Sequence, residues 1–349
     1  MDPTFMTIQQ EAQCPLFGTC GGCQYQNIPY ERELVLKGEQ LKRLLQEGLS
    51  LEGDVFGPVE PSPEAFHYRS RLDLTLRKRN NGERQMGFMV PGTQRLHEVT
   101  ACLLARKEIN AFLRELKEQA VRKLPENYRV ANLVVRVGEE GKVFWGGIGR
   151  RSLRMNVEDY FWVTVGGRKI FYALDTFFQA NHAILEKVVS RVEALVPWGP
   201  ETVFLDLYSG VGLFGIALAD RAGEVVMIEE GADAVKLAAH NIRYHDLKHV
   251  RVLKGKVETH LPEVLRGSSG KSCVALIDPP RGGLAASVVE TLVNAQELQT
   301  LFYLSCSPGS LARDLKGLTR TAWEVRKVLP FDFFPRTQHV ETLVWLARS

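Results

Sequence analysis

The sequence lacks long apolar runs. No stretch of about 18 uninterrupted apolar residues occurs in its 349 residues, so we expect no membrane span and no membrane partner. It also lacks a basic segment followed by an apolar one near its start, which makes the cytoplasm the expected compartment. The opening Met1–Phe5 resembles a vector-encoded leader before a native start at Met6 and is set aside. Repeats and low-complexity tracts are absent too, and the length allows two domains.

The net charge is small, and its distribution carries more information than its sum. Lys and Arg number 44 against 41 Asp and Glu, a balance of +3 that is too small to indicate a nucleic-acid partner. Residues 66–107, however, hold nine Lys and Arg against three Asp and Glu, with Arg77, Lys78 and Arg79 in succession. Such a patch either attracts RNA phosphates or is a solvated strand face with charged edges. Composition alone does not choose between the two.

Cysteine is scarce, and four of the six cysteines lie in the N-terminal third. Cys14, Cys20 and Cys23 have the spacing C-x5-C-x2-C, and Cys102 is the fourth. In a cytosolic protein, clustered cysteines are more often metal ligands or catalysts than disulfides. Four thiolates suffice for a zinc site or an iron–sulfur cluster, and their spacing does not separate the two. Cys273 opens its expected strand at the end away from any ligand and indicates a buried structural residue.

The pattern of apolar residues predicts three regions. Residues 1–57 hold the cysteine loop and a helix at 30–49, and residues 58–176 alternate strands with a helix at 106–124, which indicates an α+β central domain. Residues 177–349 repeat a unit of strand, glycine turn and helix. That alternation predicts an α/β fold with a doubly wound, mostly parallel sheet and helices on both faces. The strands expected in it are 203–207, 224–228, 250–253, 274–277 and 301–304, and helices are expected at 232–244 and 285–292.

A glycine loop, D-L-Y-S-G-V-G, follows the first strand of that sheet. Asp206 ends the strand, and Gly210 and Gly212 allow the backbone to turn closely against a ligand. Glu229 ends the second strand, where a carboxylate can accept both hydroxyls of a ribose. A dinucleotide-binding enzyme would place an acid there too. Two features disfavour a dinucleotide-binding enzyme. They are Asp206 at the start of the loop and the sequence D-P-P that begins at Asp278, after the fourth strand.

Two residues near the C-terminus indicate a reaction. Cys306 ends the fifth strand just before an expected helix, whose dipole would lower the pKa of its thiol. Glu341 lies in an otherwise apolar strand, where burial would raise its pKa and suit it to act as a general base; His339 is the rival base. A thiol nucleophile beside a methyl-donor site indicates alkylation of a pyrimidine carbon. Addition at carbon 6 makes carbon 5 nucleophilic, and a base must then remove the carbon-5 proton.

Five motifs together resemble the S-adenosylmethionine-dependent RNA 5-methyluridine (uracil-5-)methyltransferases. They are C-P-L-F-G-T-C-G-G-C (14–23), F-F-Q-A-N (177–181), D-L-Y-S-G-V-G (206–212), D-P-P-R-G-G-L (278–284) and the Cys306/Glu341 pair. The resemblance runs from about Cys14 to the C-terminus. It implies a class I methyltransferase fold in which the helix at 30–49 packs on the catalytic domain. The N-terminal β-barrel of many family members has no counterpart before Cys14.

The resemblance also implies ligands and roles. Gln179, Tyr208, Glu229 and Asp278 match residues that hold S-adenosylmethionine, whereas a further family contact near Lys256 is not matched. The motif around Glu341 makes this residue the proton acceptor and leaves His339 to orient the loop. The four N-terminal cysteines would hold a structural [4Fe–4S] cluster.

The expected partner is RNA, with 23S rRNA first and tRNA as the alternative, and we expect a monomer. Two other functions stay open. An RNA cytosine-5 methyltransferase typically has Pro before its cysteine, where this chain has Ser305. A non-catalytic RNA-binding iron–sulfur protein would not need Cys306, Glu341 and Asp278.

Overall fold

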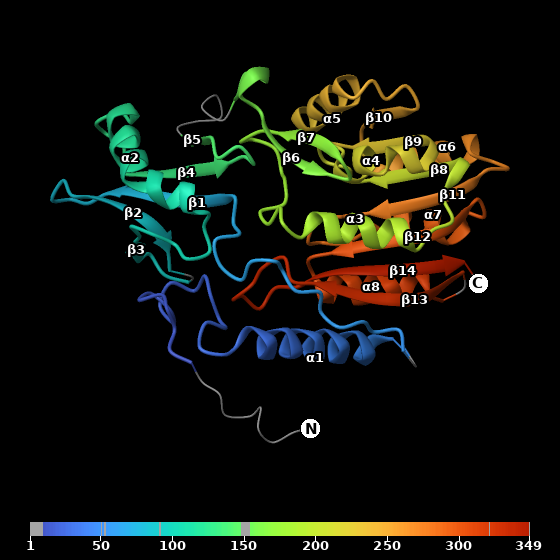
Figure 1. The fold of residues 1–349 in the computed structure, drawn as a ribbon, viewed down its shortest axis with the longest axis horizontal. Coiled ribbons are helices and arrows are strands. Elements are labelled where there is room, and N and C mark those ends of the chain that lie inside the picture. The colour runs from blue at the N-terminus through green and yellow to red at the C-terminus, as the bar shows by residue number, and fades with distance from the viewer. Residues whose placement is uncertain are drawn as a thin grey trace.

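The computed structural model describes residues 10–49, 51, 54–90, 92–147, 154–320 and 322–348. The expected native start at Met6 lies outside these residues, as do Arg150 and Arg151, an alternative basic site. Within the described ranges, no helix is long and apolar enough to cross a membrane. Figure 1 shows two lobes, a smaller one formed by the central residues and a larger one built on a long sheet.

The larger lobe is built on a seven-stranded sheet of order β10-β9-β8-β11-β12-β14-β13. Neighbouring strands are parallel except β14, which is antiparallel to both β12 and β13. The expected mixed, mostly parallel α/β architecture is therefore confirmed. The strands are β8 (Gly199–Leu207), β9 (Ala222–Glu229), β10 (Val250–Lys254), β11 (Ser272–Ile277), β12 (Leu298–Ser305), β13 (Trp323–Phe331) and β14 (Glu341–Arg348).

Helices cover both faces of this sheet because its strands are apolar on both sides. Side chains alternate along each strand, so Phe204 of β8 joins one core cluster while Val203 and Leu205 join the other. One face packs against α3 (Leu185–Ala194), α4 (Leu213–Ala217) and α5 (Ala232–Tyr244). The other packs against α1 (Tyr30–Gly48), α6 (Val257–Gly267), α7 (Ala286–Asn294) and α8 (Pro308–Leu318). Cys273 is fully buried in the second cluster, as its structural interpretation requires.

The N-terminal helix α1 packs on the catalytic sheet through Leu41 and Leu45, as expected. Its other buried residues are charged. Lys37 Nζ lies 2.8 Å from Glu33 and 2.7 Å from Asp332, and all three side chains are buried. Burial raises the pKa of Glu33 to about 7, although Lys37 opposes the shift. This buried network ties α1 to the loop between β13 and β14.

The smaller lobe is a five-stranded antiparallel sheet of order β3-β2-β1-β4-β5 with one helix, α2 (Lys107–Lys123), on one face. Leu72, Leu74 and Leu76 of β1 all face α2, as their alternation with polar residues predicts. The turn at Asn80–Gly82, a sequence typical of β-hairpins, joins the first two strands, with Gly82 at φ +84°. The strands are β1 (Arg71–Lys78), β2 (Arg84–Met89), β3 (Leu96–Glu98), β4 (Val130–Val137) and β5 (Val143–Gly146).

A hairpin of β6 (Phe161–Val165) and β7 (Arg168–Tyr172) follows, with the short helix η3 (Val157–Asp159) before it; η4 (Ala219–Arg221) precedes β9. The hairpin was not expected from the sequence. It packs into the core of the larger lobe and also contacts the five-stranded sheet, where the Phe161 ring meets that of Phe144 of β5 at 5.8 Å between centroids. The domain boundaries after residues 57 and 176 stay predictions.

Candidate active site

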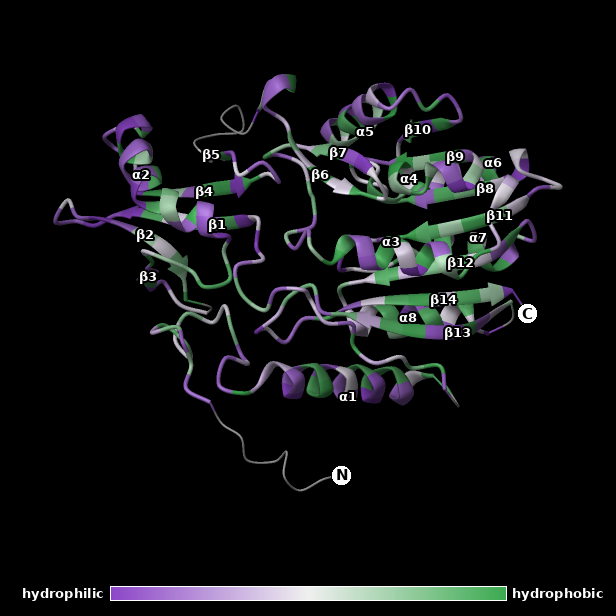
Figure 2. Ribbon diagram, viewed as in Figure 1, coloured by the Kyte–Doolittle hydropathy of each residue, from purple (hydrophilic) through white to green (hydrophobic). Residues whose placement is uncertain are grey.

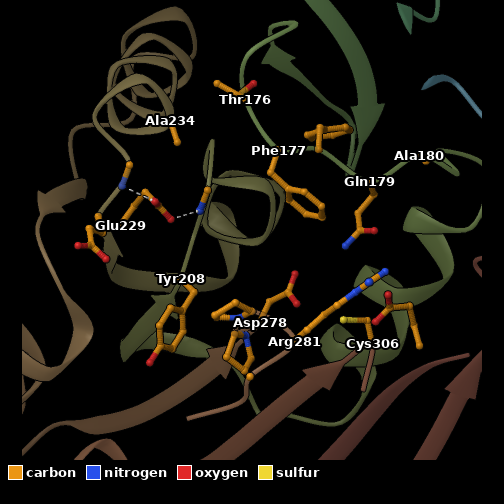
Figure 3. Close-up of a pocket in the computed structure, with 18 of the residues that line it drawn as sticks. Thr176, Phe177, Gln179, Ala180, Tyr208, Glu229, Ala234, Asp278, Arg281 and Cys306 are labelled. Atoms are coloured by element: carbon orange, nitrogen blue, oxygen red, sulfur yellow. Dashed lines mark hydrogen bonds between the residues drawn. The ribbon is translucent and has the colours of Figure 1, made fainter. Parts of the chain in front are cut away.

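A cavity of about 1540 Å³ opens at the carboxyl ends of β8, β9, β11 and β12, where open α/β sheets bind ligands. Its wall also includes parts of the smaller lobe and of the cysteine loop. Figure 3 shows Cys306, Arg281 and Asp278 together on one side of this cavity and Glu229 on the other. The cavity therefore joins the residues that the sequence assigned to the reaction and to the cofactor.

Strand register sets Cys306 beside Glu341. Ser305 of β12 is the partner of Thr342 of β14 in an antiparallel ladder. Cys306 directly follows the first of these residues and Glu341 directly precedes the second, so the two lie just beyond the last pair of the ladder, at the cavity edge. Directly opposed residues in such a ladder have Cα atoms about 4.5–5.5 Å apart. Two residues 35 positions apart in the chain thus face each other, and both line the cavity.

The surroundings of the cavity raise the pKa of the Cys306 thiol and of the Glu341 carboxyl. Burial raises the pKa of the Cys306 thiol, Glu341 and Asp278 raise it further, and Arg281 opposes them. The lowered thiol pKa expected from the dipole of α8 is therefore wrong for the free protein, because desolvation and two carboxyls outweigh the helix. The raised pKa expected for Glu341 is confirmed. Burial lifts it well above the ordinary value, with a further contribution from Asp278 and an opposing one from Arg281.

The loop that carries Asp278 and Arg281 is fastened to α8. Ser310 Oγ donates to the Arg281 carbonyl at 2.7 Å, and buried Asp314 accepts from the Leu284 amide at 2.7 Å. Gly283 has φ +77°, and a Cβ there would lie 2.4 Å from Asp314 Oδ2 and from Arg313 Nη2. Because α8 begins two residues after Cys306, this loop and the nucleophile share one support.

The glycine loop brings Glu229 under the cavity. The Glu229 carboxylate accepts hydrogen bonds from the Gly210 amide at 2.9 Å and from the Gly231 amide at 2.6 Å (Figure 3). Tyr208 lines the cavity with a left-handed backbone, φ +61°. The cavity is thus lined by five of the cofactor residues proposed from the sequence: Gln179, Tyr208, Gly210, Glu229 and Asp278.

Asp206 and Gly212, also proposed as cofactor residues, do not line this cavity. Asp206 is 1% exposed, and its Oδ2 accepts from the Gly215 amide at 2.7 Å. Gly212 has φ +88°, and a Cβ there would lie 2.9 Å from Met227 Sδ. Both residues shape the loop from below.

The segment F-F-Q-A-N is held from the smaller lobe. Arg136 of β4 donates to the carbonyls of Ala173 at 2.6 Å and Thr176 at 3.1 Å, and Ser70 Oγ donates to the Ala180 carbonyl at 3.0 Å. Phe177 is 72% exposed, and its ring points into the cavity (Figure 3). Sequence reasoning assigned no role to Phe177, Arg136 or Arg281. Phe177 and Arg281 lie inside quoted motifs, which could have identified them, whereas Arg136 carried no such signal.

Comparison with known proteins decides the family. The sequence model of the tRNA (Uracil-5-)-methyltransferase family matches residues 152–349, more than half of the chain. The chain belongs to this family. It is therefore an S-adenosylmethionine-dependent RNA (uracil-5-)methyltransferase.

Relatives match the methyltransferase along most of its length. A Clostridium tetani protein described as an uncharacterized RNA methyltransferase is 29% identical over an alignment of 394 positions that covers 97% of this chain and 84% of that protein. The tRNA (uracil(54)-C(5))-methyltransferase of Schizosaccharomyces pombe is 27% identical, over 96% of this chain and 65% of its own length. The structure of Pyrococcus abyssi tRNA (uracil-54, C5)-methyltransferase in complex with S-adenosyl-L-homocysteine has the same fold, with a TM-score of 0.71 at 24% identity, covering 93% of this chain and 86% of that one.

The four N-terminal cysteines of the methyltransferase line a second, smaller cavity of about 260 Å³. All four are half-buried free thiols. Burial raises the pKa values of Cys23 and Cys102, to about 11 for Cys23, and the other thiols of the group add to both shifts. Among the described residues, no three Cys, His, Asp or Glu side chains are arranged to hold one metal ion.

Proposed function

We propose that this methyltransferase acts through a covalent adduct between Cys306 and carbon 6 of a uridine in RNA. The observation that carries the proposal is the β12–β14 register, which sets a thiol and a carboxyl side by side at a cavity lined by Gln179, Glu229 and Asp278. S-adenosylmethionine supplies the electrophilic methyl group. Covalent catalysis of this kind needs a nucleophile and a base in reach of one ring.

Each step uses a residue of the cavity wall. The Cys306 thiolate forms a bond to carbon 6, and the electron pair displaced by this bond makes carbon 5 nucleophilic. Carbon 5 then takes the methyl group, whose bond to the sulfonium sulfur breaks with its electron pair staying on sulfur, so that S-adenosylhomocysteine is released. The Glu341 carboxylate accepts the carbon-5 proton, and the electrons of that C–H bond restore the ring double bond as the sulfur–carbon bond breaks. Arg281 opposes the rise in the pKa of Cys306 and of Glu341, so it favours the thiolate and the carboxylate that the two steps require.

The substrate that we propose first is tRNA. The matching family and two of the proteins above carry tRNA in their names. The expectation of 23S rRNA stays a prediction, and no feature of the cavity favours it. Mass-spectrometric mapping of 5-methyluridine in tRNA and rRNA, from cells with and without the gene, tests both. A uridine that loses its methyl group with the gene identifies the substrate, whereas unchanged 5-methyluridine in both RNAs would contradict the proposal.

We also propose that Cys14, Cys20, Cys23 and Cys102 hold a [4Fe–4S] cluster. A zinc ion would need all four sulfurs at about 2.3 Å from one point, and the described thiols are not arranged to hold one ion. A cluster binds each thiolate to a different iron and so fits four thiols spread around one cavity. The cluster would tie the cysteine loop to the smaller lobe through Cys102.

Anaerobically purified protein is therefore expected to be brown, with broad visible absorbance and four irons and four sulfides per chain. Cys102→Ser should lose the colour and lower the melting temperature, whereas Cys273→Ser should keep the colour. Stoichiometric zinc without iron or sulfide would contradict the cluster and leave the methyl-transfer proposal intact.

A further inference from the structure

The five-stranded sheet of the smaller lobe has one uncovered face. Helix α2 covers the other through the apolar residues of β1 and β4. Because successive side chains of a strand point to opposite faces, the remaining residues share the uncovered face. These residues are Arg71, Asp73, Thr75 and Arg77 on β1, and Val130, Asn132, Val134 and Arg136 on β4.

This face connects two hollows. Arg71, Asp73, Val134 and Arg136 line the active-site cavity. An open hollow of about 900 Å³, called here the second hollow and distinct from the cysteine-lined cavity, is lined by Thr75, Arg77, Val130 and Asn132. The register pairs these residues across the two strands, from Arg71 with Arg136 to Arg77 with Val130. The second hollow begins at Thr75, two residues beyond Asp73 of the active-site cavity. Six strand residues span about 20 Å, so Arg77 lies about that far from Arg71 along one continuous surface.

The active-site end of this face carries excess positive charge. Arg71 and Arg136 are directly opposed across the ladder, an arrangement of like charges that destabilises a sheet. Asp73 forms an ion pair with Arg71 at 2.7 Å. Arg136 forms none among the described residues, and its buried Nε has no hydrogen-bond partner. Burial lowers the pKa of Arg136 to about 10, and Arg71 lowers it further. Asp73 and Asp175 oppose this fall in pKa without forming an ion pair with Arg136, so the buried side chain adds positive charge beneath this end of the face rather than a contact for RNA.

The far end is basic as well. Within the described ranges, Arg77, Lys78 and Arg129 form no ion pair. Arg77 donates to the Gln94 carbonyl at 2.7 Å and Lys78 to the Glu126 carbonyl at 2.8 Å, contacts that hold the side chains without neutralising them. All three cations line the second hollow. In Figure 2 the neighbouring tip of the β1–β2 hairpin is hydrophilic.

We propose that this uncovered face is an RNA track that carries the substrate strand from the active site to phosphate contacts at Arg77 and Arg129. The inference rests on the proposed function, which brings the target nucleotide into the cavity. Cations without acidic partners attract phosphates and release their counterions. Exposed Val130 (57%) and Met89 (37%) at the far end add apolar surface for riboses or bases. A single small anion would not need two basic hollows joined over this length.

The test compares two charge-matched double variants. Arg77→Gln with Arg129→Gln removes two cations from the track. Arg114→Gln with Arg122→Gln removes two from α2, on the opposite side of the sheet, where Arg114 is 93% exposed. Binding of fluorescent oligouridines of 4 and 20 nucleotides is measured across salt concentrations. The track variant should bind the 20-mer roughly tenfold more weakly, with a salt slope reduced by about 1.4, which is 0.7 for each lost phosphate contact of a single strand.

The 4-nucleotide oligouridine is too short to extend from the active-site cavity to Arg77 and Arg129, so it should bind both variants like the unaltered protein. The α2 variant should bind both oligomers normally. Equal losses in the two double variants, or normal 20-mer binding by the track variant, would overturn the track. Methylation of bulk tRNA by each protein is measured in parallel. If the track variant methylates tRNA and binds the 20-mer normally, the track is refuted and the proposed function stands. If 20-mer binding depends on Arg77 and Arg129 but no RNA is methylated, the proposed function is refuted and the face remains an RNA-binding surface.

Discussion

Cys306 and Glu341 are adjacent, yet the proposed chemistry uses them at successive steps. Cys306→Ala should form no covalent RNA adduct and transfer no methyl group. Glu341→Gln should still allow addition and methylation but not proton removal, so it should accumulate a methylated covalent complex. The complex is detected as a shifted band on a denaturing gel after incubation with RNA and the methyl donor.

His339→Ala is the control for this experiment, because its ring also lines the cavity and contacts Phe334 at 6.1 Å between centroids. It should slow turnover without trapping the adduct. Normal turnover by Glu341→Gln together with an adduct in His339→Ala would exchange the two roles.

Asp206 predicts a dependence of stability on pH. Burial raises its pKa to about 7, the Gly215 amide opposes this shift, and Asp278 and Glu229 add to it. The folded protein therefore keeps a proton that the unfolded chain releases near pH 4, so the favourable contribution is complete below that pH and is lost as the pH rises through about 7. Asp206→Asn, which cannot ionise, should therefore gain in melting temperature relative to the unaltered protein as the pH rises from 5 to 8.

Thermal unfolding without the methyl donor, at several pH values, measures this difference. Glu263→Gln, at an exposed position of α6, is the control and should show no such trend. A difference between Asp206→Asn and the unaltered protein that stays constant from pH 5 to pH 8 would mean that Asp206 is ionised throughout.

At the scale of elements, α1 supports the loop that ends at Glu341. Lys37 donates to the Phe334 carbonyl at 3.1 Å in addition to its two carboxylates, and Glu33 accepts from the Arg336 amide at 2.7 Å. Lys37→Met would leave Asp332 buried without its cation and Glu33 with only Arg336, at 3.6 Å. Removing one partner of a buried ion pair typically costs 3–5 kcal/mol, so the free energy of unfolding should fall by about that amount.

The same variant should impair methyl transfer more than binding of the methyl donor, because the loop positions Glu341 and does not contribute to the glycine loop. Denaturant unfolding and calorimetric titration with S-adenosylhomocysteine measure the two effects. Arg43→Met, at an exposed position of α1, should change neither. Equal losses of donor affinity and turnover would show that α1 supports the whole domain rather than this loop.

Elements with strong periodicity were predictable, and those set by tertiary contacts were not. The helix predicted at 232–244 is α5 with the same bounds, because its apolar spacing and flanking glycine are local signals. Strand β13 was missed. It carries Glu324, Arg326 and Lys327 at the edge of the sheet and includes Pro330, features that favour an exposed or non-strand segment when read alone. Its pairing with β14 overrides them.

At the scale of the whole molecule, motifs located the site but not its electrostatics. Apart from Gln179, each proposed cavity residue lay at a strand end or in a glycine loop, where parallel sheets bind ligands. The thiol pKa of Cys306 could not be predicted because it depends on burial and on Glu341, whose proximity follows only from the β12–β14 register. The role of Arg136 could not be predicted either, because the sequence does not indicate that an arginine within a strand will be buried at a cavity wall.

The packing of α1 against α8 and the β13–β14 loop has a consequence for biosynthesis. Lys37 of α1 precedes its partner Asp332 by 295 residues, and Glu33 precedes Arg336 by 303. Strand β14, which follows these partners in the chain, inserts between β12 and β13. Contacts between such distant segments form late and slow folding. During synthesis, α1 therefore leaves the ribosome well before the segments that it packs against, and Cys306 leaves before the strand that places Glu341 beside it.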